Sequence, residues 1–143
     1  MTKSKIRAFY GLAIWGAAAL IFLGVFFLGG GPEGFTRTPT RVLVAAVALM
    51  LGYAGYSIML RRTRRTPADE RDALIASRAS GFALTSVLLF VFLVSIILYE
   101  SYHAAGALPV GWMWFMAYFT ACFGYLSHAV ITLFLHRDMG GDA

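Results

Sequence analysis

The sequence predicts an all-α integral membrane protein, a four-helix bundle that forms one membrane domain over residues 1–143. Composition is the first reason: the chain is 59% hydrophobic and only 13% charged, with a mean hydropathy of +0.73, whereas soluble domains carry about a quarter charged residues. Four long apolar stretches are the second, and a one-sided distribution of basic residues is the third. A soluble fold of this length could not cover its core with so few charges, so lipid must replace the missing polar surface.

Each of the four apolar stretches is long enough to cross a bilayer. They cover residues 8–28, 42–60, 79–99 and 110–135. A helix needs about 20 residues to cross a hydrocarbon layer of ~30 Å. The first stretch ends at Gly29-Gly30-Gly31-Pro32, through which no helix is expected to continue. Its length and the lack of a small-x-small cleavage site favour an uncleaved signal anchor over a signal peptide.

The basic residues predict how the chain is oriented. Lys3, Lys5 and Arg7 precede the first span, six arginines lie in the 61–78 loop, and Arg137 follows the fourth span. Arg37 and Arg41 are left for the other side. By the positive-inside rule, both termini and the 61–78 loop are expected in the cytoplasm, with the protein in the cytoplasmic (inner) membrane as a multi-pass protein.

The 61–78 loop begins with a dense basic run. It is formed by Arg61, Arg62, Arg64 and Arg65. Such a run can bind anionic lipid headgroups, at about 1 kcal/mol per residue near the surface. Topology determination explains the same run equally well, and both can hold together. Nucleic-acid binding is not expected, because neither interleaved aromatic residues nor a folded soluble module accompanies it.

A helix-start motif follows this run. Thr66 can cap a helix and Pro67 suits the first helical position, while Asp69 and Glu70, just ahead of Arg71, place negative charge near the positive end of the helix. We therefore expect the third helix to begin near Pro67. It would then extend into the cytoplasm for several turns before it enters the membrane.

The stretch Asp69-Glu70-Arg71-Asp72-Ala73-Leu74-Ile75-Ala76-Ser77-Arg78-Ala79 leads straight into the third apolar stretch. It resembles a pattern of uncharacterised prokaryotic four-helix membrane proteins of the DUF2178 type. In these proteins an acidic "DER" start and an "Ile…basic-Ala" step precede the third span. The resemblance covers this segment and the overall hydropathy layout. It implies a location and a layout, but no activity, because the family has no established one.

Residues that could carry catalysis are scarce. No Asp, Glu, Lys or Arg lies within the four predicted spans, and an intramembrane charge is the usual sign of ion-coupled transport. The single cysteine, Cys122, has no CxxC or Cys/His spacing around it, so neither zinc nor dithiol chemistry is indicated. We therefore assign no catalytic, cofactor-binding or metal-binding residue and expect a protein that is not an enzyme.

His128 is the histidine that lies clearly inside a span. Gly124, Thr132 and His136 share its helix face by four-residue steps. This polar stripe could line a helix interface, a proton path or a haem position, although a haem held by two histidines would need another at similar depth. The interpretation we favour is a neutral histidine hydrogen-bonded to a hydroxyl on another helix, with Gly124 allowing close packing.

Glu100 and His103 form the second weak candidate, at the outer end of the third span. Their three-residue spacing would let them share a proton or bind a divalent ion weakly. Two ligands do not make a metal site, so an interfacial cap or a solvated pair is the favoured interpretation.

Three classes of function stay open. The leading hypothesis is an accessory or interaction protein that binds another membrane protein, or a second copy of itself, through helix faces and the basic loop. Small residues such as Gly16 and Gly24 in the first span and Gly52 and Gly55 in the second suit close helix packing, inside the bundle by default. The alternative is a small oligomeric transporter or channel with His128 on its polar path. A membrane enzyme or electron carrier comes third, because it would require a cofactor.

Overall fold

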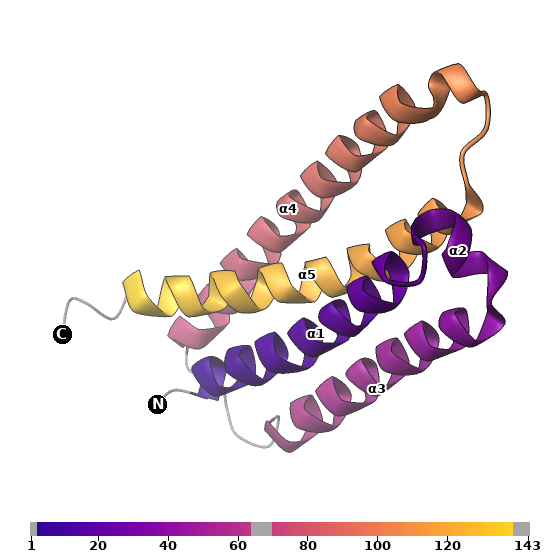
Figure 1. The fold of residues 1–143 in the computed structure, drawn as a ribbon. Coiled ribbons are helices and arrows are strands. Elements are labelled where there is room, and N and C mark those ends of the chain that lie inside the picture. The colour runs from indigo at the N-terminus through magenta and orange to yellow at the C-terminus, as the bar shows by residue number, and fades with distance from the viewer. Residues whose placement is uncertain (1–2, 64–69, 139–143) are drawn as a thin grey trace.

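The computed structural model describes residues 3–63 and 70–138. These residues form five α-helices, α1 (Lys3–Phe27), α2 (Gly31–Arg37), α3 (Pro39–Thr63), α4 (Glu70–Tyr102) and α5 (Val110–Asp138), and a 3-10 turn, η1 (His103–Ala105). Helices α1, α3, α4 and α5 are long and apolar enough to cross a membrane (Figure 1). The four predicted spans are therefore confirmed.

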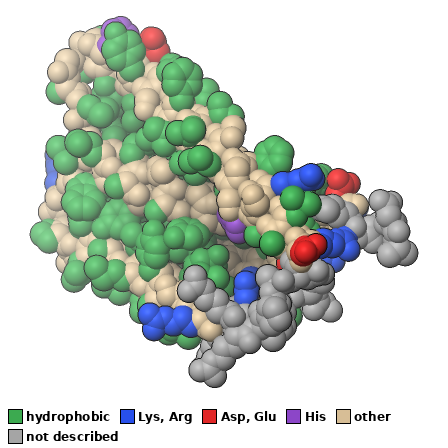
Figure 2. Space-filling model, turned by 180° about the vertical axis from the view of Figure 1, so that it is seen from behind, with side chains coloured by type: hydrophobic (Ala, Val, Ile, Leu, Met, Phe, Trp, Pro, Cys, Tyr) green, Lys and Arg blue, Asp and Glu red, His purple; other side chains and the backbone are tan. Residues whose placement is uncertain are grey.

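The four long helices lie side by side in the order α3, α1, α5, α4. Helix α1 packs between α3 and α5, and α4 packs against the other side of α5. We call the end that holds Lys3 and Asp138 the terminal end, and the end that holds α2 and η1 the loop end. Helix α4 crosses α5 near the terminal end and diverges from it toward the loop end (Figure 1). Hydrophobic side chains cover the broad middle of the molecule, and charged ones gather toward its ends (Figure 2).

Helix α1 ends where the glycine run predicts. Gly30 and Gly31 have φ values of 92° and 66°, a left-handed conformation that glycine adopts without a Cβ penalty. The chain then forms the short helix α2, which the sequence did not predict. Helix α2 has a proline in its first turn, and its Phe35 is fully buried. Seven residues with two glycines carry too little periodicity to be recognised as a helix.

Aromatic rings form the core. Near the loop end, Phe35 of α2 packs with Phe22 and Phe26 of α1 and with Phe115 of α5. Farther along the bundle a second cluster forms around the fully buried Trp15. Its indole stacks on the ring of Tyr125, with centroids 4.2 Å apart and planes 4° from parallel. Cys122 is buried in this cluster as a small apolar side chain.

The predicted small residues of α1 and α3 mostly serve packing inside the bundle. A Cβ atom added at Gly52 would lie 3.5 Å from the Trp15 ring, and one added at Gly55 would lie 3.8 Å from Ile14. One added at Gly16 would lie 3.9 Å from Leu126 of α5. Gly24 is the exception, because a Cβ there would meet nothing within 4 Å.

Candidate functional site: the cavities around His128

At the loop end, the predicted Glu100 and His103 do not meet through their charged groups. The Nδ1 atom of His103 lies 3.0 Å from the backbone carbonyl oxygen of Glu100, and its ring stacks on Tyr99. Both side chains are exposed. Within residues 3–63 and 70–138, no group of three or more His, Cys, Asp or Glu side chains could hold a metal ion. This contact therefore belongs to the end of a helix.

The divergence of α4 from α5 leaves a crevice of about 780 Å³ at the loop end. Its lining is mainly apolar and includes Leu98, Met113 and Met116. At its rim the indole N–H of Trp112 donates to the hydroxyl of Tyr102 at 3.0 Å, which links the start of α5 to the end of α4.

His128 lies between two adjoining cavities in the half of the bundle nearer the terminal end. The inner cavity, of about 210 Å³, is lined by residues of all four long helices, and its polar side chains include Ser4 and Arg7 of α1 and Tyr56 of α3. The outer cavity, of about 410 Å³, lies along α4 and α5. Tyr56, Tyr125 and His128 line both cavities. His128 thus faces cavities.

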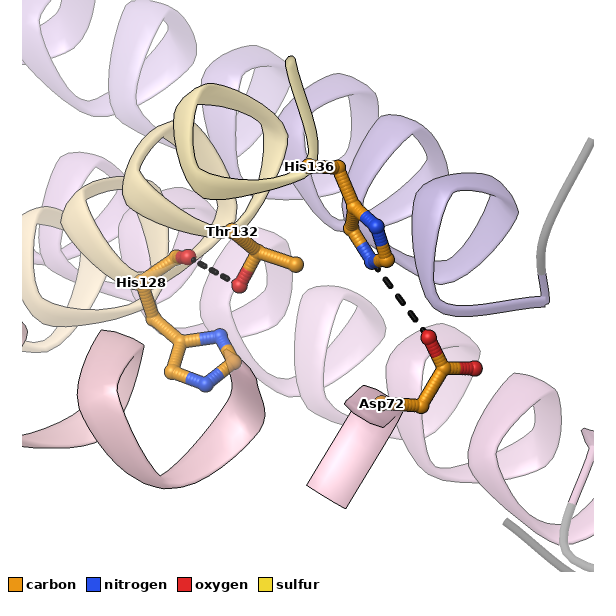
Figure 3. A network of polar contacts seen from close by, with 4 residues as sticks. All are labelled: Asp72, His128, Thr132 and His136. Carbon is orange, nitrogen blue, oxygen red and sulfur yellow. Dashed lines mark hydrogen bonds and ion pairs between the residues drawn. The ribbon is translucent and has the colours of Figure 1, made fainter. Parts of the chain in front are cut away.

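The predicted polar stripe on α5 is divided between these cavities. Thr132 lines the inner one, Gly124 lines the outer one, and His136 lines neither. The hydroxyl of Thr132 donates to the backbone carbonyl of His128 at 2.7 Å, while the imidazole of His128 projects from α5 toward α4 (Figure 3). A Cβ atom at Gly124 would lie 3.3 Å from Val87 of α4. Gly124 therefore allows the close helix packing that its position predicted.

His136 makes a contact with a carboxylate that the sequence did not predict, and this contact is an ion pair when the imidazole is protonated. Its Nε2 atom lies 3.7 Å from Oδ1 of Asp72 (Figure 3). The pair joins the end of α5 to the first turn of α4, and His136 is only 4% exposed. No local pattern marks this contact, because the two residues lie on different helices far apart in the chain.

The described residues of the basic run and of the helix-start motif lie at the terminal end. Arg61 is exposed on the last turn of α3. The side chain of Arg62 and the residues Arg64, Arg65, Thr66, Pro67 and Asp69 lie outside the described residues. Within them, α4 begins at Glu70, well before the predicted span at residue 79, and Glu70 and Asp72 supply negative charge to its first turn. The predicted extension of this helix beyond the apolar stretch is confirmed.

Four apolar spans and charges gathered toward the ends define a multi-pass membrane protein. The chain belongs to the DUF2178 family of predicted membrane proteins, whose sequence model matches residues 5–139. The resemblance noted around residues 69–79 is thus confirmed, and it extends over nearly the whole chain. Comparison with curated proteins and with solved structures gives no match.

Proposed function

We propose that this protein is a non-enzymatic accessory protein of the cytoplasmic membrane that associates with a second membrane helix through α4. Both termini and the 61–78 segment would lie in the cytoplasm, which the distribution of Lys and Arg supports. The arginines around Arg61 would hold that segment at anionic lipid headgroups. A ridge of small, exposed residues on α4 is the observation that carries the proposal.

This ridge consists of Ser77, Gly81 and Thr85, which follow one another at four-residue steps and are all exposed. It lies opposite the face that packs on α5, where Ile75 and Ala79 are fully buried. A Cβ atom at Gly81 would meet nothing within 4 Å. The hydroxyl of Thr85 donates to the carbonyl of Gly81 at 3.1 Å, so its polar group is satisfied within the helix. Small residues at this spacing let two membrane helices approach closely.

A second copy of this chain is the partner that the ridge fits best. A flat ridge of small residues can pack against itself across a two-fold axis, so that one patch serves both subunits. The glycines that could offer a similar surface on α1 and α3 mostly face neighbouring helices inside the bundle. Helix α4 is therefore the span whose small-residue ridge faces outward.

Single-molecule photobleaching in liposomes, over a range of protein-to-lipid ratios, tests this association. We expect wild-type protein to form dimers, and Gly81→Ile to weaken dimerisation at least about tenfold because the added side chain separates the helices. Gly24→Ile is the matched control, since a Cβ at Gly24 also meets nothing within 4 Å but lies on α1. Wild-type protein that is monomeric at every ratio would contradict the proposal. Equal effects of Gly81→Ile and Gly24→Ile on dimerisation would show that the α4 ridge is not the interface. Any other membrane protein that binds this chain would then have to contact a different face.

A small oligomeric transporter or channel is the second candidate function. His128 lines cavities in one half of the bundle, and the loop-end crevice extends the α4–α5 spaces into the other half. Between them the ring of Phe90 on α4 packs against Phe119 and Phe123 on α5, with centroids 5.4 and 4.8 Å apart. A path along these helices would have to open that stack. Proton flux into liposomes loaded with a pH-sensitive dye should then change in His128→Ala, and equal flux in both forms would exclude this function.

A further inference from the structure

We propose that the two cavities around His128 bind an anionic membrane amphiphile, with its oxyanion headgroup in the inner cavity and its acyl chain in the outer one. This site is separate from the α4 ridge and does not depend on association. The proposal rests on three features: the donors of the inner cavity, the small apolar lining of the outer cavity, and the depth at which the two lie.

The inner cavity is rich in hydrogen-bond donors. Arg7 supplies a guanidinium group, Ser4 and Tyr56 supply hydroxyls, and His128 supplies an imidazole. A guanidinium group stays charged at physiological pH and binds carboxylate or phosphate through paired N–H donors. An oxyanion is therefore the ligand group that this lining suits.

The outer cavity suits an apolar chain. Its walls between α4 and α5 include Ala83, Ala121 and Gly124, whose small size leaves the space. Ser80 and Thr120 add hydroxyls, and that of Ser80 already donates to the carbonyl of Ala76 at 2.9 Å. The volume of about 410 Å³ lies within the range of about 300–1,000 Å³ that is usual for small-molecule sites. An inner cavity that carries a guanidinium and hydroxyls, joined to a more apolar outer one, matches a molecule with a charged head and a hydrocarbon tail.

The depth of the two cavities matches a lipid in the adjacent leaflet. Arg7 immediately precedes the first apolar stretch, so the inner cavity lies near the membrane boundary. Ala83 and Thr120 lie farther into the apolar stretches of α4 and α5, so the outer cavity extends toward the middle of the hydrocarbon layer. An amphiphile bound with its head at Arg7 would keep the direction that it has in the bilayer.

Trp15 offers a reporter for this binding. Its indole stacks on Tyr125, which lines both cavities, and the two other tryptophans of the chain lie at the loop end of α5. Replacing these two tryptophans (Trp112→Phe and Trp114→Phe) leaves Trp15 as the tryptophan that fluoresces. In such a protein, provided that it elutes from a size-exclusion column like wild type, doxyl-labelled stearate should quench Trp15 fluorescence, and the quenching should saturate with concentration. Quenching that rises linearly without saturation would mean bulk partitioning and would overturn the proposal.

Competition identifies the source of the headgroup. Unlabelled palmitate that reverses quenching supports a free fatty acid as the ligand, whereas reversal by phosphatidylglycerol but not by phosphatidylcholine supports an anionic phospholipid. Inorganic phosphate has the charge but no chain. If phosphate competes as strongly as palmitate, the site binds a free anion and the assignment of the outer cavity is wrong.

Two variants test the two parts of the site separately. Arg7→Gln should weaken doxyl-stearate binding at least about tenfold, while the matched control Arg137→Gln removes an exposed charge at the same end and should leave binding unchanged. Equal losses in both would indicate general electrostatic attraction and contradict the proposal. Ala121→Leu fills the outer cavity without changing charge, so it keeps the test decisive even if Arg7→Gln fails to fold. Unchanged binding in Ala121→Leu would overturn the assignment of the chain to that cavity.

Discussion

Helices α1 and α4 are both long enough to cross a membrane, but they are held in the protein in opposite ways. Helix α1 packs between α3 and α5. In the most apolar 18-residue stretch of α1, 33% of the residues are buried inside the protein, against 11% in the corresponding stretch of α4. The buried side chains of α1 include large rings, among them Trp15 and Phe26. Helix α4 packs on α5 and buries mainly small or aliphatic side chains such as Ile75 and Ala79.

This difference separates the part of the protein that holds the fold from the part that is free to contact something else. Inside a membrane, a helix gains no hydrophobic free energy by exchanging lipid for protein, so its position depends on close packing and on polar contacts. Helix α1 has such packing along much of its length. Helix α4 is closely packed near the terminal end, where Asp72 also contacts His136 of α5. Toward the loop end α4 diverges from α5 (Figure 1). Substitutions in the two helices should therefore act on different properties.

The largest effect is expected at Trp15, the centre of the α1 packing. Trp15→Ala removes a fully buried ring that contacts Tyr53, Tyr56 and Tyr125. We expect a loss of about 2–4 kcal/mol in the free energy of unfolding, because the packing contacts of the ring are lost and a cavity stays behind. Titration of purified protein from mild detergent into SDS measures this loss. Trp114→Ala is the control, because that ring is 38% exposed and should cost much less.

Trp15→Phe sharpens this prediction. The indole Nε1–H of Trp15 has no hydrogen-bond partner among the described residues. Phenylalanine would therefore keep much of the stacking without leaving an acceptor unpaired, and its cost should be well below that of alanine. If Trp15→Ala destabilises the protein no more than Trp114→Ala does, the contrast between a packed α1 and a lightly held α4 is wrong.

An intermediate effect is expected at Arg41, which holds the connection between α1 and α3. Its Nη1 atom donates to the carbonyl oxygens of Gly29 and Gly34, the latter at 2.9 Å. Arg41→Ala would leave both partly buried carbonyls without this donor. Since a hydrogen bond to a charged group contributes about 1.5–3 kcal/mol, we expect a loss of that order in the same SDS titration.

The matched control for this prediction is Arg37→Ala, which removes an exposed arginine from the same connection. It should change stability little, because exposed charges contribute little. Similar losses in Arg37→Ala and Arg41→Ala would show that net charge at the loop end matters, and not the two bonds to the backbone.

The features that the sequence predicted are those with a local signal. A long apolar run marks each span, the glycine run marks the end of α1, and the acidic first turn marks the extension of α4. Gly124 could be assigned to close packing because a missing side chain has that consequence wherever the helix lies. In each of these cases a few neighbouring residues determine the outcome.

The features that the sequence missed depend on which helix faces meet. The spans are apolar on all sides, so no stripe predicts that Arg7 and Tyr56 would lie beside His128. Arg41 was taken only as a charge on the outer side, because the carbonyls that it binds come together only once the glycine loop has folded. The same holds for His136 and Asp72, which meet across two helices.

The smallest effect on stability, and the clearest effect on α4, is expected at Asp72. Asp72→Asn removes the charge that faces His136 at 3.7 Å but leaves the buried Ile75 and Ala79 contacts in place. We expect the free energy of unfolding to change by less than about 1 kcal/mol, because the contact at 3.7 Å is too long for a hydrogen bond and is an ion pair only when His136 is protonated. The position of α4 should respond more, because the pair links its first turn to α5.

Nitroxide labels on cysteines introduced at Leu74 of α4 and Arg137 of α5 would measure that response, since both positions are exposed and the native Cys122 is buried. In Asp72→Asn the distance distribution between the labels should broaden toward longer separations. Asp138→Asn, an exposed carboxylate at the end of α5, is the control and should leave the distribution unchanged. An unchanged distribution in Asp72→Asn would show that apolar packing alone fixes the terminal end of α4. A loss of stability as large as that of Trp15→Ala would instead place α4 in the same packed unit as α1.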